Sequence, residues 1–132
     1  MLVGLHQRGY EDLIAPHLTI LQYPGPENRR PSDLATRTRM TKQALNYLLG
    51  QMEELGYLER VPDSADQRFK RIRVTPRGRA ASAAMREIVL ETEAEWARTL
   101  GPGRFAELRD LLARLSEAVS PGVEPAGKGA PQ

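Results

Sequence analysis

The stretch that decides the fold runs from residue 32 to residue 79 and reads SDLATRTRMTKQALNYLLGQMEELGYLERVPDSADQRFKRIRVTPRGR. It predicts a helix, a tight turn, a second helix, and two short strands joined by a charged loop. That order is a helix-turn-helix followed by a basic hairpin, or wing. One helix of such a unit can enter a DNA major groove while the wing reaches an adjacent minor groove. We therefore predict a mainly α (α+β) fold built around a winged helix-turn-helix.

The second helix of this stretch has two faces of different character. It is expected to begin after Thr41, whose hydroxyl can accept from a free backbone amide, and to end near Leu55 before Gly56. The face expected to pack inward consists of Ala44, Leu45, Leu48, Leu49, Met52 and Leu55. The start of the opposite face is predicted to meet the major groove through Thr41, Lys42, Gln43, Asn46 and Tyr47.

The chemistry of these polar side chains favours contact with bases. Gln43 and Asn46 can each pair with the edge of an adenine, and Lys42 suits guanine or a phosphate. The alternative is a solvated helix end, which also carries polar residues. A solvated face more often shows paired Glu and Lys, so two amides beside Tyr47 favour a recognition helix.

The wing is predicted to consist of strands over 57–61 and 69–75 with a charged loop between them. Arg68 lies near the loop tip, where a guanidinium could enter a narrow minor groove, and Asp66 is placed to orient it. The alternative is a local ion pair on a solvated loop, which contributes little, and both interpretations can hold together. Further basic side chains are predicted to bind phosphates, namely Arg37, Arg39, Arg60, Lys70, Arg71 and Arg73.

The residues before this stretch predict only short elements. A helix over 2–13 is weakened by its two glycines, and a second helix runs from Pro16 to about Tyr23. Residues 24–30 predict a loop, after which Pro31 begins the first helix of the helix-turn-helix.

The residues after this stretch predict two long helices, over 76–99 and 103–119, followed by a disordered tail over 120–132. Both helices carry apolar stripes that are expected to face inward, with Met85 and Trp96 in the core or a dimer interface. The stripes consist of Ala81, Met85, Ile88, Thr92, Trp96, Leu100, Phe105, Leu108, Leu111, Leu112 and Leu115. We expect one domain over 1–119, and the long striped helix favours a dimer.

Charge is distributed unevenly along the chain. Residues 29–79 contain 12 Lys and Arg against 6 Asp and Glu, whereas the other 81 residues contain 7 against 11. A basic middle with acidic flanks is typical of a surface that binds a polyanion, although a solvated basic face would give the same counts.

Several classes of site are disfavoured by composition. The chain has no Cys, which excludes disulfides and thiolate metal sites, and it has no apolar run of membrane-spanning length and no signal peptide. We expect a cytoplasmic protein without cofactor or metal. Only two histidines are present, and His17 is the candidate for lining an effector pocket, with a place at the core edge or surface as the alternative. Glu91, Glu93 and Glu95 beside Arg98 suit a solvated helix face. Nothing in the sequence indicates an enzyme.

Three motifs carry a resemblance to a known family. RPSDLA, MTKQALNYLLGQMEELGYLERVPD and DQRFKRIRVTPRGR resemble the winged helix-turn-helix regulators of the MarR type over about residues 16–100. The resemblance implies a homodimeric transcription factor, usually a repressor, on a palindromic double-stranded operator. It implies major-groove contact by the recognition residues above and minor-groove contact by Arg68. It also implies dimerisation through residues 76–119 and the N-terminus, and in many relatives release from DNA by a small ligand.

The chain departs from the family pattern at two places. Relatives usually have Gly in the turn where this chain has Arg39, and a positive φ there would cost on the order of 1 kcal/mol for a non-Gly residue. The long first helix of the family is mostly absent before Gly9. This truncation leaves two alternatives open, which are a winged-helix protein–protein interaction module and a DNA-binding protein without an effector.

Overall fold

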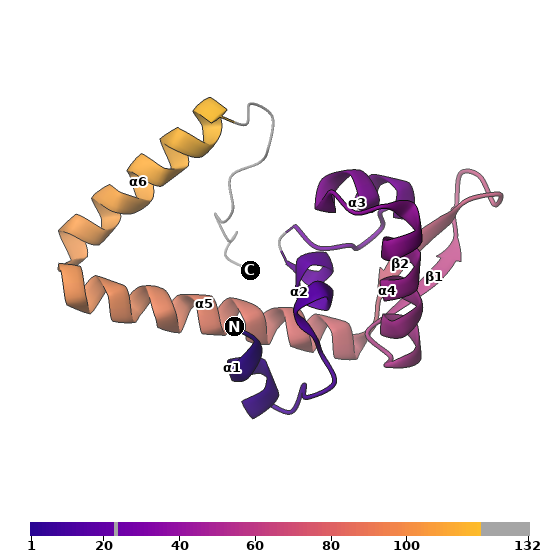
Figure 1. The fold of residues 1–132 in the computed structure, drawn as a ribbon, viewed down its shortest axis with the longest axis horizontal. Coiled ribbons are helices and arrows are strands. Elements are labelled where there is room, and N and C mark those ends of the chain that lie inside the picture. The colour runs from indigo at the N-terminus through magenta and orange to yellow at the C-terminus, as the bar shows by residue number, and fades with distance from the viewer. Residues whose placement is uncertain (23, 120–132) are drawn as a thin grey trace. The chain divides into compact units, whose positions relative to one another are not determined.

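The computed structural model describes residues 1–22 and 24–119 and divides the chain into two compact units, Met1–Arg86 and Glu87–Gln132. We call the first unit the lobe and the described part of the second the C-terminal unit. Tyr23 and the tail predicted over 120–132 lie outside the described residues. The elements, shown in Figure 1, are α1 (Leu2–Gln7), α2 (Ala15–Leu21), α3 (Pro31–Thr38), α4 (Lys42–Glu54), β1 (Leu58–Pro62), β2 (Lys70–Val74), α5 (Pro76–Leu100) and α6 (Pro102–Val119).

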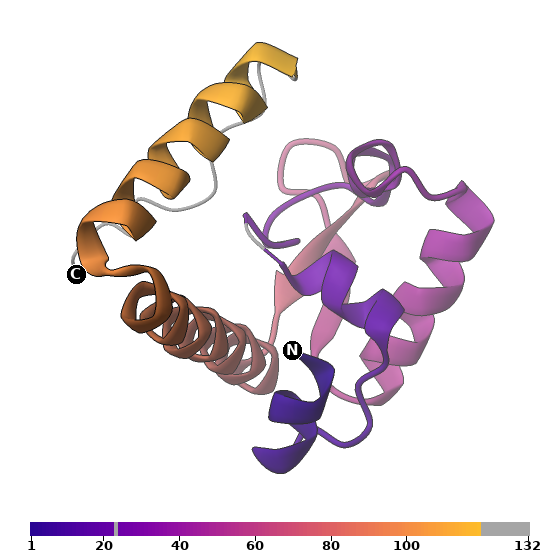
Figure 2. The ribbon, with the colours of Figure 1, turned by 60° about the vertical axis from the view of Figure 1, so that its left-hand side comes forward.

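The core of the lobe is formed where α2, α3 and α4 meet the hairpin. The hairpin packs beside α3 and α4, as the two views of Figures 1 and 2 agree. Every element of the lobe contributes a side chain that is at most 1% exposed. These side chains include Leu5, Leu13, Ile20, Leu34, Leu45, Leu49, Met52, Tyr57, Leu58, Ile72 and Ala81. Each fully buried Leu or Ile contributes about 1.5–3 kcal/mol. The predicted inner face of the recognition helix is thus confirmed for Leu45, Leu48, Leu49 and Met52, whereas Leu55, at the end of the helix, is half-buried and Ala44 is exposed.

The N-terminal segment is less helical than the prediction over 2–13. Helix α1 ends at Gln7, and Gly9 adopts a φ of +92° that no helix can continue through. Leu13 is nevertheless fully buried, so the segment contributes to the core as a turn rather than as a helix. Helix α2 begins at Ala15 with Pro16 in its first turn, as predicted, and ends at Leu21.

The two strands form an antiparallel hairpin in which Leu58 is opposite Val74 and Pro62 is opposite Lys70. The first strand begins and ends one residue later than predicted, so Tyr57 lies just before it, and the second is one residue shorter at each end, which leaves Phe69 outside it. The loop expected at 24–30 adds backbone pairing to the free edge of β2. The amide of Asn28 donates to the carbonyl of Ile72 at 2.7 Å, and the amide of Ile72 donates to the carbonyl of Arg29 at 2.9 Å. This pairing occupies backbone groups that an edge strand would otherwise expose.

The start of α5 is fitted closely against the end of α4. Thr75 caps α5 by accepting from the amide of Gly78 at 3.1 Å, and its hydroxyl donates to the carbonyl of Gly56. A Cβ atom at Gly78 would lie 2.0 Å from the carbonyl oxygen of Tyr57. The motif Thr-Pro-x-Gly therefore has a physical basis here, because the third residue of α5 has no room for a side chain.

Tyr57 anchors the N-terminal segment to the same junction. Its ring is fully buried, its hydroxyl donates to Asp12, and the guanidinium of Arg77 stacks on it at 4.4 Å. Burial and the hydrogen bond to Asp12 raise the pKa of Tyr57. Burial alone would raise the pKa of Asp12, but the hydrogen bond from Tyr57 and the charge of Arg77 outweigh it and lower that pKa.

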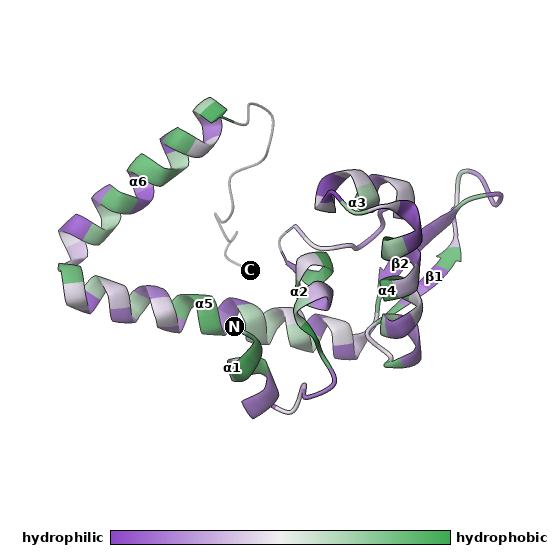
Figure 3. Cartoon of the chain, viewed as in Figure 1, coloured by the Kyte–Doolittle hydropathy of each residue, from purple (hydrophilic) through white to green (hydrophobic). Residues whose placement is uncertain are grey.

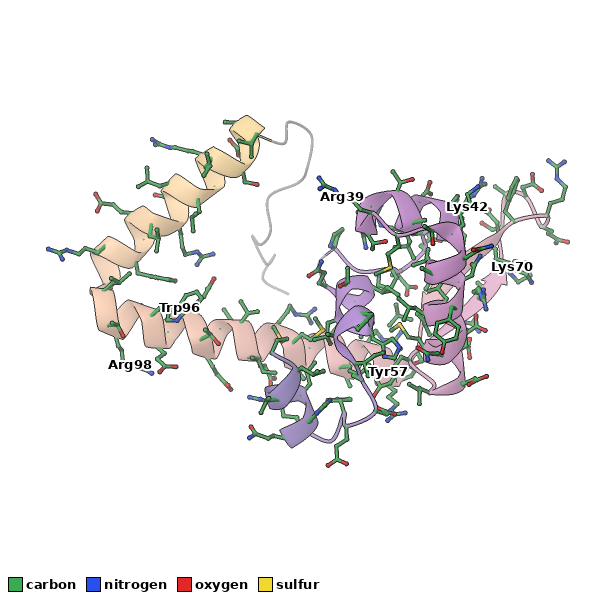
Figure 4. All side chains as sticks on the ribbon, viewed as in Figure 1. Arg39, Lys42, Tyr57, Lys70, Trp96 and Arg98 are labelled. Carbon is green, nitrogen blue, oxygen red and sulfur yellow. The ribbon has the colours of Figure 1, made fainter. Side chains whose placement is uncertain are left out.

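The C-terminal unit is built differently. Helices α5 and α6 are joined at Gly101, whose φ is +88°, and Figure 2 shows the sharp turn of the chain there. Within the described residues, α6 buries no side chain. The prediction that its stripe faces inward is therefore wrong for the isolated chain, because nothing in this unit covers it. Trp96 is likewise 55% exposed on α5 (Figure 4). Figure 3 shows apolar bands recurring along α6.

Candidate nucleic-acid interface

The turn between α3 and α4 closes through a left-handed residue. Arg39 has φ 57° and ψ 30°, the conformation in which relatives of this turn usually place Gly. The amide of Met40 donates to the carbonyl of Ala35 at 3.1 Å, which ends α3. Thr41 then caps α4 by accepting from the amide of Ala44 at 3.1 Å, as the sequence predicts. The helix-turn-helix is thus closed by backbone and capping bonds even without glycine.

The predicted recognition residues lie together on the outer surface of α4. Thr41, Lys42, Gln43 and Asn46 are exposed, and Tyr47 is 68% exposed although it is aromatic. Their opposite face carries Leu45, Leu48 and Leu49 into the core. The buried face fixes the helix and leaves the polar groups free to bind a ligand.

The wing loop holds its arginine outward. Arg68 is 83% exposed and forms an ion pair with Asp66, with Nη2 2.7 Å from Oδ2. The carboxylate also accepts from the backbone amide of Arg68 at 3.1 Å. The hydrogen bond from the Arg68 side chain lowers the pKa of Asp66, and Asp66 raises the pKa of Arg68. The pair predicted from the sequence is present, and it restricts the direction of the guanidinium while leaving one of its edges free.

A buried carboxylate at the base of the wing was not found from the sequence. Asp63 is 1% exposed and accepts from the amide of Ala65 at 2.8 Å, from Arg71 at 2.6 Å and from Arg30 at 3.1 Å. The amide of Ala65 is the main reason that the pKa of Asp63 falls to about 2, and the two guanidinium groups lower it further against the effect of burial. Because Arg30 precedes α3 and Arg71 is on β2, Asp63 joins the wing to the helix-turn-helix. The sequence offered one weak signal for this network, which is an acidic residue directly after a strand, and nothing linked it to Arg30 or Arg71.

The aromatic ring of Phe69 strengthens the same connection. The guanidinium of Arg30 lies 4.4 Å from the ring centre, and that of Arg68 lies 5.9 Å from it. Cation–π contacts of this kind contribute about 0.5–1 kcal/mol at exposed sites. Phe69 therefore lies between the guanidinium that anchors the wing and the one at its tip.

The side chains predicted to bind phosphates fall into two groups. Four are engaged within the lobe: Arg71 with Asp63 and Asn28, Arg60 with Glu53, Arg73 with Glu59, and Arg37 with the carbonyl of Gly25. Burial lowers the pKa of Arg37. Among the described residues, Arg39 and Lys70 have no acidic partner, and Figure 4 shows Lys42 and Lys70 on the same side of the lobe. The structure therefore leaves the second group, Arg39 and Lys70, more available to an external anion.

An open groove of about 360 Å³ separates the start of α4 from the wing. Five of its lining residues are cationic, and none of its described lining residues is acidic. They are Arg30, Pro31, Ser32, Lys42, Leu45, Asn46, Arg60, Arg68, Phe69 and Lys70. Although Arg30, Arg60 and Arg68 pair with carboxylates outside the lining, Lys42 and Lys70 leave the groove net positive, so this surface suits a polyanion that passes between helix and wing.

His17, the candidate for an effector pocket, is a buried residue whose ring nitrogens both have partners. It is 2% exposed, Nδ1 lies 3.3 Å from the amide of Ile14, and Nε2 lies 3.1 Å from Oε1 of Gln51. A ligand would have to displace one of these groups. Within the part of the chain that the structure describes, no three His, Asp or Glu side chains are placed to hold a metal ion.

Comparison with known families matches the same segment. The model of the MarR family aligns with residues 16–68, from α2 to the wing tip. Over these residues the chain is similar to the MarR family, and its fold is that of a winged helix-turn-helix protein. The comparison with curated proteins found no match. Of the helices that the structure describes, none has both the length and the apolar character needed to cross a bilayer.

Solved structures share the fold over more of the chain than the family model does. FabT from Streptococcus pneumoniae in complex with DNA is 20% identical, with a TM-score of 0.73 over 89% of this chain and 86% of that one. The transcriptional repressor CouR bound to a 23-mer DNA duplex is 19% identical, with a TM-score of 0.63 over 87% and 83%. PcaV from Streptomyces coelicolor in complex with its natural ligand is 18% identical, with a TM-score of 0.55 over 87% and 88%. At these identities the likeness concerns the fold.

Proposed function

We propose that this protein is a sequence-specific regulator of transcription of the MarR type that binds double-stranded DNA and catalyses no reaction. The observation that carries the proposal is the cationic groove between α4 and the wing, which adjoins an exposed polar recognition face. FabT and CouR, which have the same fold, were solved with DNA. Such a role would place the protein in the cytoplasm.

Each part of the interface has a separate role in this proposal. The exposed residues of α4, Thr41, Lys42, Gln43, Asn46 and Tyr47, read base edges in the major groove. Arg68, held by Asp66, enters the minor groove. Arg39 and Lys70 bind phosphates, and the arginines engaged within the lobe mainly fix its shape.

We further propose a homodimer that represses transcription. The support for a dimer is the exposed apolar surface of the C-terminal unit, which comprises Val89, Leu90, Trp96, Leu100, Leu108, Leu111, Leu112, Leu115 and Val119. Helix surfaces with many exposed large apolar side chains commonly mark an interface with another protein chain. A two-fold dimer would present two recognition helices to a palindromic operator. CouR, whose fold this chain shares, is a transcriptional repressor.

Release by a small ligand is the least supported part of the proposal. PcaV has this fold and was solved with a natural ligand. In the present chain, both ring nitrogens of the buried His17 are engaged. This observation favours the second candidate, a regulator that binds DNA without an effector.

The salt dependence of DNA binding tests the proposal. Fluorescence anisotropy with labelled random-sequence duplex should show affinity falling steeply with salt, with a log–log slope of about −0.9 per phosphate contacted. The double variant Arg39→Ala/Lys70→Ala, which removes the two side chains assigned to phosphates, should make that slope less negative by about 2. A folded chain that bound no duplex at low salt would contradict the proposal and favour a protein–protein interaction module.

A further inference from the structure

A chain of hydrogen bonds runs from a buried histidine to the exposed tyrosine of the recognition face. His17 on α2 is 2% exposed, whereas Tyr47 on α4 is 68% exposed. Gln51 lies between them, with Oε1 3.1 Å from His17 Nε2 and Nε2 3.1 Å from the Tyr47 hydroxyl. Gln51 and Tyr47 are neighbours because residues four apart on a helix lie on the same face.

The backbone amide of Ile14, which begins this series of hydrogen bonds, fixes the direction of every hydrogen bond that follows. The backbone amide of Ile14 can only donate, and it lies 3.3 Å from Nδ1 of His17, so Nδ1 must accept. A neutral imidazole then carries its proton on Nε2, which donates to the Gln51 oxygen. The Gln51 amide must therefore turn its NH₂ group toward Tyr47, whose oxygen accepts. The hydroxyl hydrogen of Tyr47 is left to donate outward.

We infer that His17 and Gln51 are positioning residues that hold the Tyr47 hydroxyl as a hydrogen-bond donor toward the DNA. This inference rests on the proposed function, because it assumes that the exposed face of α4 meets a duplex. A donor at this position would select an acceptor, which in DNA means a phosphate oxygen, guanine O6 or N7, adenine N7, or thymine O4. It would not select the amino group of adenine or cytosine.

We call the series of hydrogen bonds from His17 through Gln51 to Tyr47 the relay. Two substitutions of His17 distinguish an effect of the direction of these hydrogen bonds from an effect of their existence. Gln at position 17 can accept from the Ile14 amide, as Gln does in a capping box, and can still donate to Gln51. Glu at the same position can only accept when ionised. His17→Glu would therefore attract the NH₂ group of Gln51, turn its oxygen to Tyr47, and draw the hydroxyl hydrogen inward.

The first test measures binding of the full chain to a duplex enriched from a random library. Tyr47→Phe should weaken binding on the order of 3- to 10-fold, as expected for the loss of one hydrogen bond. His17→Gln should bind like the unchanged chain, and His17→Glu should lose about as much as Tyr47→Phe. The decisive variant is His17→Glu/Tyr47→Phe, which should bind no more weakly than Tyr47→Phe alone.

Independent losses in the double variant, or unchanged affinity of Tyr47→Phe, would overturn the inference. Failure of the unchanged chain to bind any duplex would instead overturn the proposed function. A loss in Tyr47→Phe confined to one or two base positions would assign the acceptor to a base. A uniform loss across sequences would assign it to a phosphate.

The second test needs no DNA. A long-range ¹H–¹⁵N correlation spectrum of the folded chain reports which ring nitrogen of His17 carries the proton. The relay requires the Nε2–H tautomer, and the Nδ1–H tautomer would overturn it. This measurement decides the direction of the relay even if His17→Glu fails to fold, which thermal unfolding would reveal.

Discussion

The lobe and the C-terminal unit handle their apolar residues in opposite ways. In the lobe, apolar side chains from α1 to α4, both strands, the start of α5 and the intervening turns are buried together. Polar groups such as Asp63 and His17 that are buried with them have partners. In the C-terminal unit, leucines at 111, 112 and 115 are 61%, 56% and 58% exposed. The lobe is therefore complete within one chain, whereas the C-terminal unit requires a covering surface. This difference is why we propose that the lobe binds DNA and that the C-terminal unit forms a dimer interface.

The largest effect on stability is expected when one methyl group is added at a glycine of the lobe, and the same change at a glycine of the C-terminal unit is the control. Gly78→Ala should destabilise the protein by about 3 kcal/mol, because the new Cβ would overlap the carbonyl of Tyr57. Gly103→Ala is the matched control, since nothing lies within 4 Å of its Cβ position in α6, and it should be neutral or stabilise by about 0.5–1 kcal/mol. Urea unfolding measures both. Equal effects at the two sites would contradict the close packing assigned to the start of α5.

A charge in the apolar surface of α6 tests the other side of the comparison. Leu112→Glu should convert a dimer into a monomer of 14.7 kDa. Burial of Leu112 in the interface would contribute about 2 kcal/mol, and the substitution replaces it with a charged side chain. Light scattering measures the molar mass, and circular dichroism checks that the helices remain. Arg114→Glu changes charge on the same exposed helix without removing an apolar group. A protein that is monomeric before any substitution would contradict the role given to this surface.

Removal of the wing-tip guanidinium should affect binding and leave folding unchanged. Arg68→Ala is expected to weaken binding to an enriched duplex about tenfold, or about 1.4 kcal/mol, since the side chain is 83% exposed and supports no core contact. Arg73→Ala is the control on the same hairpin, and its pair with Glu59 should contribute less than about 1 kcal/mol to stability. If Arg68→Ala bound as well as the unchanged chain at physiological salt, the minor-groove role would be wrong.

Asp63, at the base of the wing, should make the free energy of unfolding fall in acid but leave it unaffected around neutral pH. The pKa of this carboxyl is about 2 in the folded lobe against 3.8 for a free side chain. A depressed pKa contributes stability above the unfolded value, and that contribution is lost as pH falls from about 4 toward 2. Urea unfolding across this window should show a steeper loss for the unchanged chain than for Asp63→Asn, which has no proton to gain. Parallel curves would show that the network around Asp63 does not stabilise the ionised form.

Local signals in the sequence accounted for most of the backbone of the lobe. The Thr41 cap, the end of α4 before Gly56, and the Thr75–Pro76 start of α5 each depend on residues within one turn of each other. These features could be predicted because the physical cause lies in adjacent residues. The left-handed turn at Arg39 belongs to the same class, although its residue type gave the opposite signal.

Contacts between distant residues could not be predicted in the same way. Asp63 meets Arg30 across 33 residues, and Gln51 meets His17 across 34, and no periodicity connects these positions. The apolar stripe of α6 shows a related limit, since a pattern can indicate that a face needs covering without indicating by what. The assignment of phosphate contacts was affected most, because several of the arginines chosen for their charge are engaged by carboxylates of the lobe.

The most direct test of the central claim is a selection of bound sequences from a random duplex library at about 150 mM salt, with the molar mass of the free protein and of the complex measured in parallel. A DNA-binding lobe joined to a dimerising C-terminal unit predicts enrichment of a palindrome with half-sites about one helical turn apart, bound by two chains. No enrichment by a folded, monomeric protein would contradict both assignments at once.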